Sequence, residues 1–355
     1  MAPMRQSRMG PPSQVRACGA PRLRPDPIAG RWGPVDQRHR CAMPGLHTCA
    51  RDAYLLPDDD VPLASLKNGI ELCYDERGEG EPLVLVMGIA AQMIFWQDDF
   101  CQLLADRGFR VIRFDHRDVG LSTKLHHLPV PSAPRTLACM LTGLRCRAPY
   151  ALEDMAGDVA GLLDALAIEQ AHVVGVSMGG MVAQTMAITH PHRMRSLVSI
   201  MSTTGAPGVL ISEPRALGAL LSSPPRTREE AIAKHLELFR IVRSTRWELD
   251  EDALIDRAGR AWDRGSYPRG ALRHLAAIAA TGDRTARLRF VRTPTLVLHG
   301  TVDPLIRPIG GELTAAAIPD AKLRWIEGMG HDLPRGAWPL LIDLIARHAH
   351  DASTR

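Results

Sequence analysis

The chain has 355 residues, an apolar fraction of 45% and a formal net charge of +4, a composition typical of a globular protein that buries a large core. No stretch approaches the roughly 18 to 20 consecutive apolar residues of a transmembrane helix, so we expect no membrane span. Residues 1–57 contain nine arginines, no lysine and three acids, a charge of +6, which leaves −2 for the remainder and argues against a nucleic-acid partner.

The first 57 residues are rich in Arg, Pro and Gly and poor in aliphatic side chains. Such a segment buries too little apolar surface to offset the entropy lost on ordering, so we expect a disordered extension. Its Arg-rich, acid-poor composition resembles a transit peptide, but no amphipathic period accompanies the arginines. A flexible tail, or a true start at Met43, explains it more simply. The segment has no apolar core of a secretory signal, which favours a cytoplasmic protein.

Seven cysteines are scattered along the chain without a CxxC pair, and we expect them to be reduced thiols. They are Cys18, Cys41, Cys49, Cys73, Cys101, Cys139 and Cys146. The spacing of the last two would allow a bridge in an oxidising setting.

From residue 58 onward the sequence predicts alternating strands and helices. The Asn68-Gly69 pair between Pro62–Lys67 and Ile70–Glu76 favours a hairpin, because both turn positions need positive φ. Later segments that are apolar on both faces predict strands of a parallel sheet covered on each side by helices. These are Leu83–Met87, Arg110–Phe114, His172–Val176, Leu197–Met201, Thr295–Leu298 and Lys322–Ile326.

Helical periodicity lies between these strands, over Met93–Arg107, Leu152–Leu166 and Met178–Thr189. A repeated strand-then-helix order predicts a mostly parallel, doubly wound α/β sheet whose ligands bind at the carboxyl ends of the strands.

The interval 202–285 breaks this order, since it holds helical candidates and no convincing strand. Thr227-Arg228-Glu229-Glu230 is a capping box that opens a helix through about Ser244. Two more helices are expected over Glu251–Asp263 and Pro268–Ala280. We therefore expect a core of residues 58–201 and 286–349, with 202–285 inserted as a helical cap. A second insertion, from about Lys124 to Tyr150, is a candidate addition to this cap.

Gly175-Val176-Ser177-Met178-Gly179 matches GxSxG between a predicted strand and a predicted helix. In that context the serine lies on a sharp, strained turn that exposes its hydroxyl, and the glycines leave room for the turn. A serine hydroxyl is a poor nucleophile at neutral pH, so a base must take its proton and an acid must orient the base. Ser177 is therefore the candidate nucleophile.

Its partners are expected later in the chain, the acid first and then the histidine. Asp303 follows the predicted strand ending at Leu298, and His331 follows the next strand. Both positions are loops at strand ends, where the three side chains can converge. The loop 202–205, one strand earlier, offers no acid. Asp332 is a less favoured acid because it adjoins the base in sequence.

The charge that develops on the substrate oxygen needs preorganised donors, usually two backbone amides. The amides of Met178, directly after the serine, and of Ile89, after the strand Leu83–Met87, are the candidates. Trp96, Trp247, Trp262 and Tyr267 are candidates for an apolar pocket and are equally compatible with an ordinary core. The chain has no His/Cys ligand cluster and no GxGxxG after a strand, so we expect no metal and no nucleotide cofactor.

Over about residues 61–349 the chain resembles the α/β-hydrolase superfamily. Residues 114–122, Phe-Asp-His-Arg-Asp-Val-Gly-Leu-Ser, are similar to the turn after the fourth strand in many members. Val86-Met87-Gly88 and Gly328-Met329-Gly330-His331 are similar to the aclacinomycin methylesterase group and related bacterial esterases. The chain departs from the commoner pattern by having Met87 where a histidine usually precedes the glycine.

The resemblance implies cofactor-free hydrolysis of a carboxylic ester. Together with the triad it predicts an acyl-enzyme on Ser177 and a small to medium, moderately hydrophobic substrate. The same residues are compatible with a lactone, a thioester, a C–C bond or perhydrolysis of the haloperoxidase kind. A non-catalytic ligand receptor is the third hypothesis, less favoured because all three candidate catalytic residues are present.

Overall fold

The computed structural model describes residues 61–144, 146–207 and 213–354, so the predicted extension over 1–57 lies outside the described residues. Within these ranges one sheet has the strand order β1-β2-β4-β3-β5-β6-β7-β8. The strands are β1 (Leu63–Ser65), β2 (Glu71–Arg77), β3 (Glu81–Val86), β4 (Phe109–Phe114), β5 (Ala171–Val176), β6 (Met194–Ile200), β7 (Thr295–Gly300) and β8 (Lys322–Ile326).

The sheet is mostly parallel, as predicted. Strands β3 to β8 all pair in parallel, whereas β2 runs antiparallel to both β1 and β4. The predicted hairpin is present, and its turn is closed by the Leu66 amide donating to the Ile70 carbonyl at 2.8 Å. Gly69 in this turn has a φ of 81°, a conformation that favours glycine.

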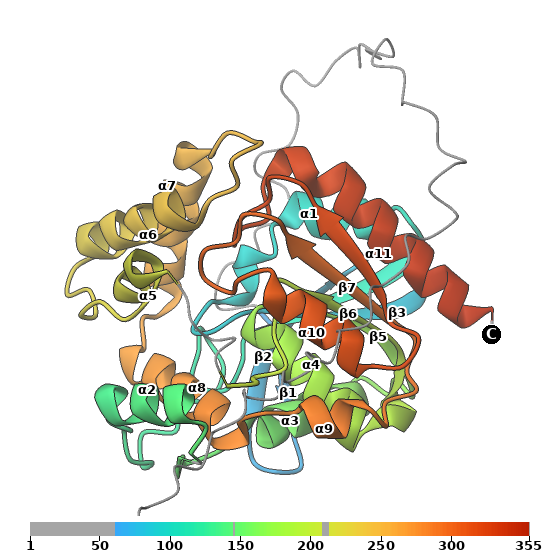
Figure 1. The fold of residues 1–355 in the computed structure, drawn as a ribbon, viewed down its shortest axis with the longest axis horizontal. Coiled ribbons are helices and arrows are strands. Elements are labelled where there is room, and N and C mark those ends of the chain that lie inside the picture. Colours follow the sequence, from blue (N-terminus) through green and yellow to red (C-terminus); the bar gives the residue numbers. More distant parts are fainter. Residues whose placement is uncertain (1–60, 145, 208–212, 355) are drawn as a thin grey trace, which may run out of the picture. The chain divides into compact units, whose positions relative to one another are not determined.

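Helices cover both faces of the sheet (Figure 1). They are α1 (Asp98–Ala105), α3 (Leu152–Ala165), α4 (Met178–Thr189), α9 (Thr285–Leu288), α10 (Ile309–Ala317) and α11 (Trp338–Ser353), with short 3₁₀ turns η3 (Met93–Phe95), η4 (Pro191–Arg193) and η5 (Arg335–Ala337). Successive side chains of a strand point to opposite faces, so Leu83 and Leu85 of β3 pack in the cluster that holds α1 and α11, while Val84 and Val86 pack with α3 and α4. This two-sided burial is why the strands are continuously apolar.

Between β6 and α9 the described residues form the helices α5 (Pro214–Leu220), α6 (Arg228–Val242), α7 (Glu251–Arg264) and α8 (Pro268–Thr281). The hydroxyl of Thr227 accepts the Glu230 amide at 3.2 Å, but the Glu230 carboxylate accepts from the Arg226 amide instead of closing a reciprocal box. Helix α5 is an addition to the predicted elements. The second insertion contains α2 (Ala133–Thr142).

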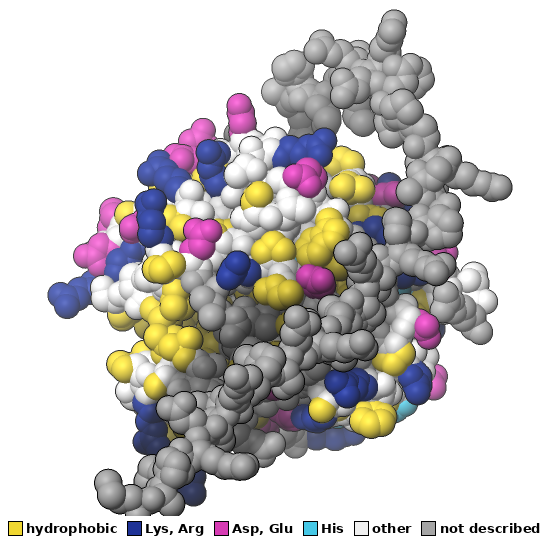
Figure 2. All heavy atoms as spheres, in the orientation of Figure 1, with side chains coloured by type: hydrophobic (Ala, Val, Ile, Leu, Met, Phe, Trp, Pro, Cys, Tyr) yellow, Lys and Arg dark blue, Asp and Glu magenta, His cyan; other side chains and the backbone are white. Residues whose placement is uncertain are grey.

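Exposed ion pairs join α6 to α7. Arg228 pairs with Asp263 at 2.9 Å and Arg240 with Glu251 at 2.6 Å. Figure 2 shows basic and acidic side chains interspersed over the side of the molecule where α5, α6 and α7 lie. Each such pair adds little stability on its own, because water and salt screen it.

The expectation that every cysteine is a reduced thiol is wrong for two of them, because Cys139 and Cys146 form a disulfide. The cause is the end of α2: Gly143 has a φ of 72° and turns the chain back, which brings the two Cα atoms to 5.9 Å. Cys73 and Cys101 are buried free thiols, and burial raises the pKa of each to about 12. The other three cysteines lie outside the described residues.

Among the helices of the described ranges, none is both long enough and apolar enough to cross a membrane.

Candidate active site

The GxSxG segment forms the sharp turn from β5 into α4. Ser177 has φ 56° and ψ −121°, a region that L-residues with a side chain rarely adopt. A Cβ on Gly179 would lie 2.1 Å from the Val86 carbonyl oxygen, and one on Gly175 would lie 2.2 Å from the Gly179 carbonyl oxygen. Only glycine fits at either position. The serine hydroxyl is thereby held above the carboxyl end of the sheet.

Three loops bring Ser177, His331 and Asp303 into one hydrogen-bonded chain. His331 Nε2 lies 3.0 Å from Ser177 Oγ, and His331 Nδ1 lies 2.8 Å from Asp303 Oδ2. The network assigns the proton to Nδ1, which donates to the carboxylate and leaves Nε2 to accept from the serine hydroxyl. Asp303 is fully buried at its side chain, and its Oδ1 accepts the amides of Leu305 and Ile306, both at 2.9 Å.

Asp332, the less favoured acid, faces away from this chain. Its Oδ1 accepts the amide and the hydroxyl of Ser244, at 2.9 and 2.5 Å. Burial raises the pKa of its carboxyl, against the lowering effect of the Ser244 hydrogen bonds. The geometry thus favours Asp303 as the partner of the base.

The amides of Ile89 and Met178 form no hydrogen bond with any residue in the described ranges. Met178 opens α4 directly after Ser177, so its amide is one of those that a helix start leaves without an intrahelical acceptor. Gly88 lies against the serine, since a Cβ there would be 3.4 Å from Ser177 Cβ. Neither amide is therefore committed to an acceptor within the described part of the protein.

Two buried histidines hold the loop that carries Ile89. His116 Nε2 contacts the Met87 carbonyl at 2.9 Å, and His274 Nδ1 accepts the Ala90 amide at 3.3 Å while its Nε2 faces the Arg117 carbonyl. Desolvation lowers the pKa of both histidines, that of His274 to about 3. At neutral pH both rings are uncharged, which is the form that can accept one hydrogen bond and donate another.

Charged residues of the turn after β4 also brace this region. Asp115 accepts the Met93 amide and pairs with Arg264, Arg117 pairs with Asp158, and Asp118 pairs with Arg273. These contacts hold the turn after β4 against α3, α7 and α8.

A cavity of about 650 Å³ opens over Ser177 and His331. Of the four predicted pocket residues, only Trp247 lines it. Trp96 is fully buried and packs against Phe100 in the core. Tyr267 contacts His126 and Arg273. Trp262 lies on α7 five residues beyond the lining residue Arg257, about 140° around the helix.

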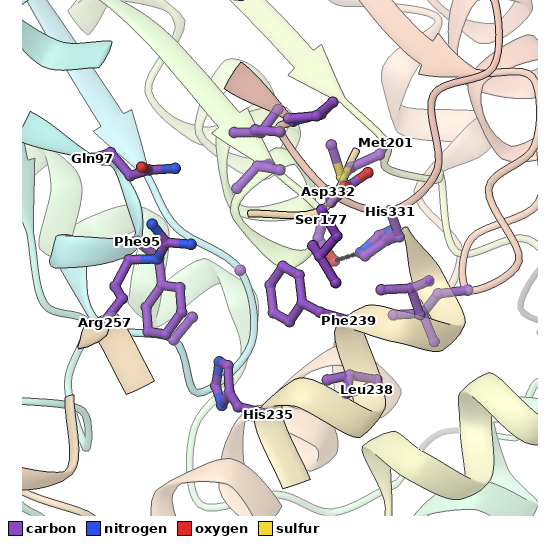
Figure 3. A pocket seen from close by; sticks show the side chains of 18 of the residues that line it. Phe95, Gln97, Ser177, Met201, His235, Leu238, Phe239, Arg257, His331 and Asp332 are labelled. Atoms are coloured by element: carbon purple, nitrogen blue, oxygen red, sulfur yellow. Dashed lines mark hydrogen bonds between the residues drawn. The ribbon is translucent and has the colours of Figure 1, made fainter. Parts of the chain in front are cut away.

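The side chains that form most of the cavity wall were not identified from the sequence. Phe95, the neighbour of Trp96, faces the cavity, and α6 contributes one face of its helix (Figure 3). That face has the spacing i, i+3, i+4, i+7 typical of an apolar helical stripe: His235, Leu238, Phe239 and Val242. This spacing is the sequence signal that could have identified these lining residues.

In the described part of the chain, no group of three or more His, Cys, Asp or Glu side chains is arranged to hold a metal ion.

Comparison with known proteins agrees with this fold. Residues 81–334 match a family model described as alpha/beta hydrolase fold. A rhodomycin D methylesterase of Streptomyces peucetius is 27% identical over 299 residues, which cover 77% of this chain and 92% of that protein. A non-heme chloroperoxidase of Kitasatospora aureofaciens is 26% identical over 288 residues, covering 77% and 93%.

Among solved structures, a meta-cleavage product hydrolase from Pseudomonas fluorescens superposes with a TM-score of 0.65 at 19% identity. The match covers 82% of this chain and 98% of that one. At this level of identity it supports a shared fold and nothing further.

Proposed function

Because the chain belongs to the α/β-hydrolase family, we propose that it is a serine hydrolase that cleaves a carboxylic ester of a small to medium, moderately hydrophobic molecule. The observation that carries this proposal is the continuous hydrogen-bonded chain from Ser177 through His331 to Asp303 at the floor of the cavity. The methylesterase relative supports ester cleavage in particular.

In the proposed reaction, Ser177 Oγ attacks the ester carbonyl carbon as its proton passes to His331 Nε2. Asp303 stabilises the imidazolium that forms, and the amides of Ile89 and Met178 donate to the oxyanion. His331 then gives the proton to the departing alcohol, which leaves an acyl-enzyme. Water attacks that acyl group with His331 again as base, which releases the acid and restores the serine.

We also propose that residues 202–285 act as a cap over the core of 58–201 and 286–349. Helices α6 and α7 supply His235, Phe239 and Arg257 to the cavity wall, while the loops after β5, β7 and β8 supply the reacting groups. Substrate choice would then depend mainly on the cap.

The test is hydrolysis of p-nitrophenyl esters of short to medium chain length by wild-type protein and by Ser177→Ala. We expect turnover by the wild type and a loss on the order of 10³-fold or more in the variant. Labelling of Ser177 by a fluorophosphonate probe should accompany it. Absence of both turnover and labelling would point to the non-catalytic receptor and overturn the proposal.

Perhydrolysis is the second candidate, because a chloroperoxidase is among the relatives and the same triad can form a peracid from an acyl group and hydrogen peroxide. Bromination that requires hydrogen peroxide and a carboxylate buffer, at a rate above that of ester hydrolysis, would favour this candidate.

A further inference from the structure

Arg257 is a half-buried arginine of the cavity wall without a carboxylate partner. No Asp or Glu of the described residues lies within 4.0 Å of its guanidinium, whose Cζ lies over the ring of Phe95, 5.7 Å from the ring centroid. Most other buried arginines have a carboxylate partner; Arg284 is an exception, but it donates to the carbonyls of Gly282 and Thr203 and does not line the cavity. Arg113, Arg117, Arg264 and Arg273 each have a carboxylate within 3.1 Å.

The two acids whose charges act most on Arg257, Asp250 and Asp256, are engaged elsewhere. Asp250 caps α7 by accepting the Ala253 amide at 3.0 Å, and Asp256 is exposed and lies 3.9 Å from Arg260. Desolvation lowers the pKa of Arg257 to about 10, a cost that Asp250 and Asp256 offset only in part. The guanidinium still carries its charge at neutral pH, in a place where that charge is incompletely compensated.

The remaining charged groups of the cavity wall do not supply the missing partner. Asp332 is bound to Ser244, Arg335 pairs with Asp99, and Arg246 and Glu248 are exposed. Among the described lining residues, Arg257 is therefore the half-buried guanidinium that an entering anion meets without a carboxylate already on it.

Figure 3 places Arg257 on the opposite side of the cavity from Ser177 and His331, with Phe239 between them. The His235 ring stacks against Phe95 and Phe239, with centroids 4.9 and 5.5 Å apart. The cavity thus has a reacting group at one end, an aromatic wall along its length, and a positive charge at the other end.

We propose that Arg257 binds a carboxylate of the substrate at the end of the cavity remote from Ser177. The preferred substrate is then an ester whose apolar or aromatic body ends in a second, unesterified carboxylate. This inference rests on the proposed ester hydrolysis and specifies the substrate class. A guanidinium binds a carboxylate through two parallel hydrogen bonds, which a lysine cannot reproduce.

The experiment compares monomethyl adipate, suberate and sebacate with their neutral ω-amides, which have the same length and shape. In the wild type we expect kcat/KM to be higher for at least one monoester than for its amide. In Arg257→Met, kcat/KM for that monoester should fall about 10- to 100-fold, mainly through KM, the loss typical of one charge-assisted interaction. The value for the amide should change less than about threefold, and Arg257→Lys should fall between the wild type and Arg257→Met.

Arg260→Met is the matched control, since Arg260 lies on the same helix and outside the cavity lining. Arg260→Met should leave kcat/KM unchanged for both substrates. If Arg257→Met lowers kcat/KM equally for monoester and amide, or leaves their ratio at the wild-type value, the carboxylate site is wrong while the hydrolase stands.

A binding measurement separates this inference from the proposed activity. In the Ser177→Ala background, adipate, suberate or sebacate should raise Tm, and Ser177→Ala/Arg257→Met should show no such rise. If no ester is turned over, the proposed function fails, and the Tm shift still decides the carboxylate site. Arg257→Met without ligand should be at least as stable as the wild type, because it removes a poorly compensated charge.

Discussion

Ser244 joins the end of α6 to Asp332, the residue after the candidate base: its amide and hydroxyl both donate to Asp332 Oδ1, at 2.9 and 2.5 Å. The same hydroxyl accepts the Gly330 amide at 3.0 Å, and the His331 amide donates to the Val242 carbonyl at 2.7 Å. The loop that carries the base is therefore fixed by the segment that follows α6.

Ser244→Ala should move the base without removing it. The change leaves the Gly330 amide without its acceptor and Asp332 with one donor fewer, at a cost of about 1–3 kcal/mol in the free energy of unfolding. We expect a lower Tm, a several-fold lower kcat and retained fluorophosphonate labelling. Ser266→Ala is the control, because Ser266 is exposed. An unchanged kcat in Ser244→Ala would mean that this contact does not position the base.

The strained backbone of Ser177 predicts opposite effects of glycine and alanine. With φ at 56° and ψ at −121°, glycine relieves about 1–3 kcal/mol of strain that alanine retains. Ser177→Gly should therefore have a higher Tm than Ser177→Ala, although both lack activity. At Ser65, on the extended strand β1, the order should reverse, because glycine there only adds chain entropy to the unfolded state. The same order at both sites would argue against strain at the serine.

Stability should fall as the pH is lowered from about 6.5. Desolvation lowers the pKa of His235 and His348 to about 4 and that of His274 to about 3. Between these values and 6.5 the unfolded chain binds protons that the folded chain excludes. Unfolding is therefore favoured progressively as the pH falls, by up to about 1.4 kcal/mol per pH unit for each histidine.

His235→Phe tests how much of this pH dependence of stability comes from one histidine. Phenylalanine preserves the stack with Phe95 and Phe239 but carries no titratable group. Urea unfolding at pH 7 and pH 5 should show a smaller loss of stability in the variant than in the wild type. Equal losses in the two proteins would show that His235 titrates normally in the folded state.

The buried pair of Arg117 and Asp158, at 2.5 Å with side chains 8% and 2% exposed, should be costly to break from one side. Asp158→Leu leaves a buried guanidinium without its carboxylate and should cost about 3–5 kcal/mol. The double change Arg117→Met/Asp158→Leu should recover much of that loss. At the exposed pair of Arg240 and Glu251, Glu251→Leu should change stability far less, because water and salt screen the pair. Equal costs at the two pairs would contradict this account.

The parts of the fold that the sequence predicted have short-range causes. The strands are apolar on both faces because helices cover both, and GxSxG needs its glycines because carbonyl oxygens lie where a Cβ would be. Asp303 and His331 could be chosen because both follow predicted strands. Only the structure shows that His331 lies within hydrogen-bonding distance of both Asp303 and Ser177.

The cavity wall could not be predicted in this way, because it depends on which side of a loop or helix faces inward. Trp96 was chosen and its neighbour Phe95 lines the cavity, because η3 ends at Phe95 and the extended backbone at Trp96 places that side chain in the core. The isolation of Arg257 depends on the distances to every acid around it, which no spacing in the sequence encodes. The disulfide of Cys139 and Cys146 depends on the left-handed Gly143.

Helices α6 and α7 lie between β6 and β7 in the chain, so His235, Phe239 and Arg257 of the cavity wall are encoded apart from the reacting groups, whereas Phe95 follows β3. Mutant libraries confined to α6 and α7 should therefore yield new selectivities at little cost in reactivity. The exception is the short stretch 242–246, which ends α6 and also makes hydrogen bonds with the loop that carries His331. There, a gain in selectivity and a loss in rate should arise together.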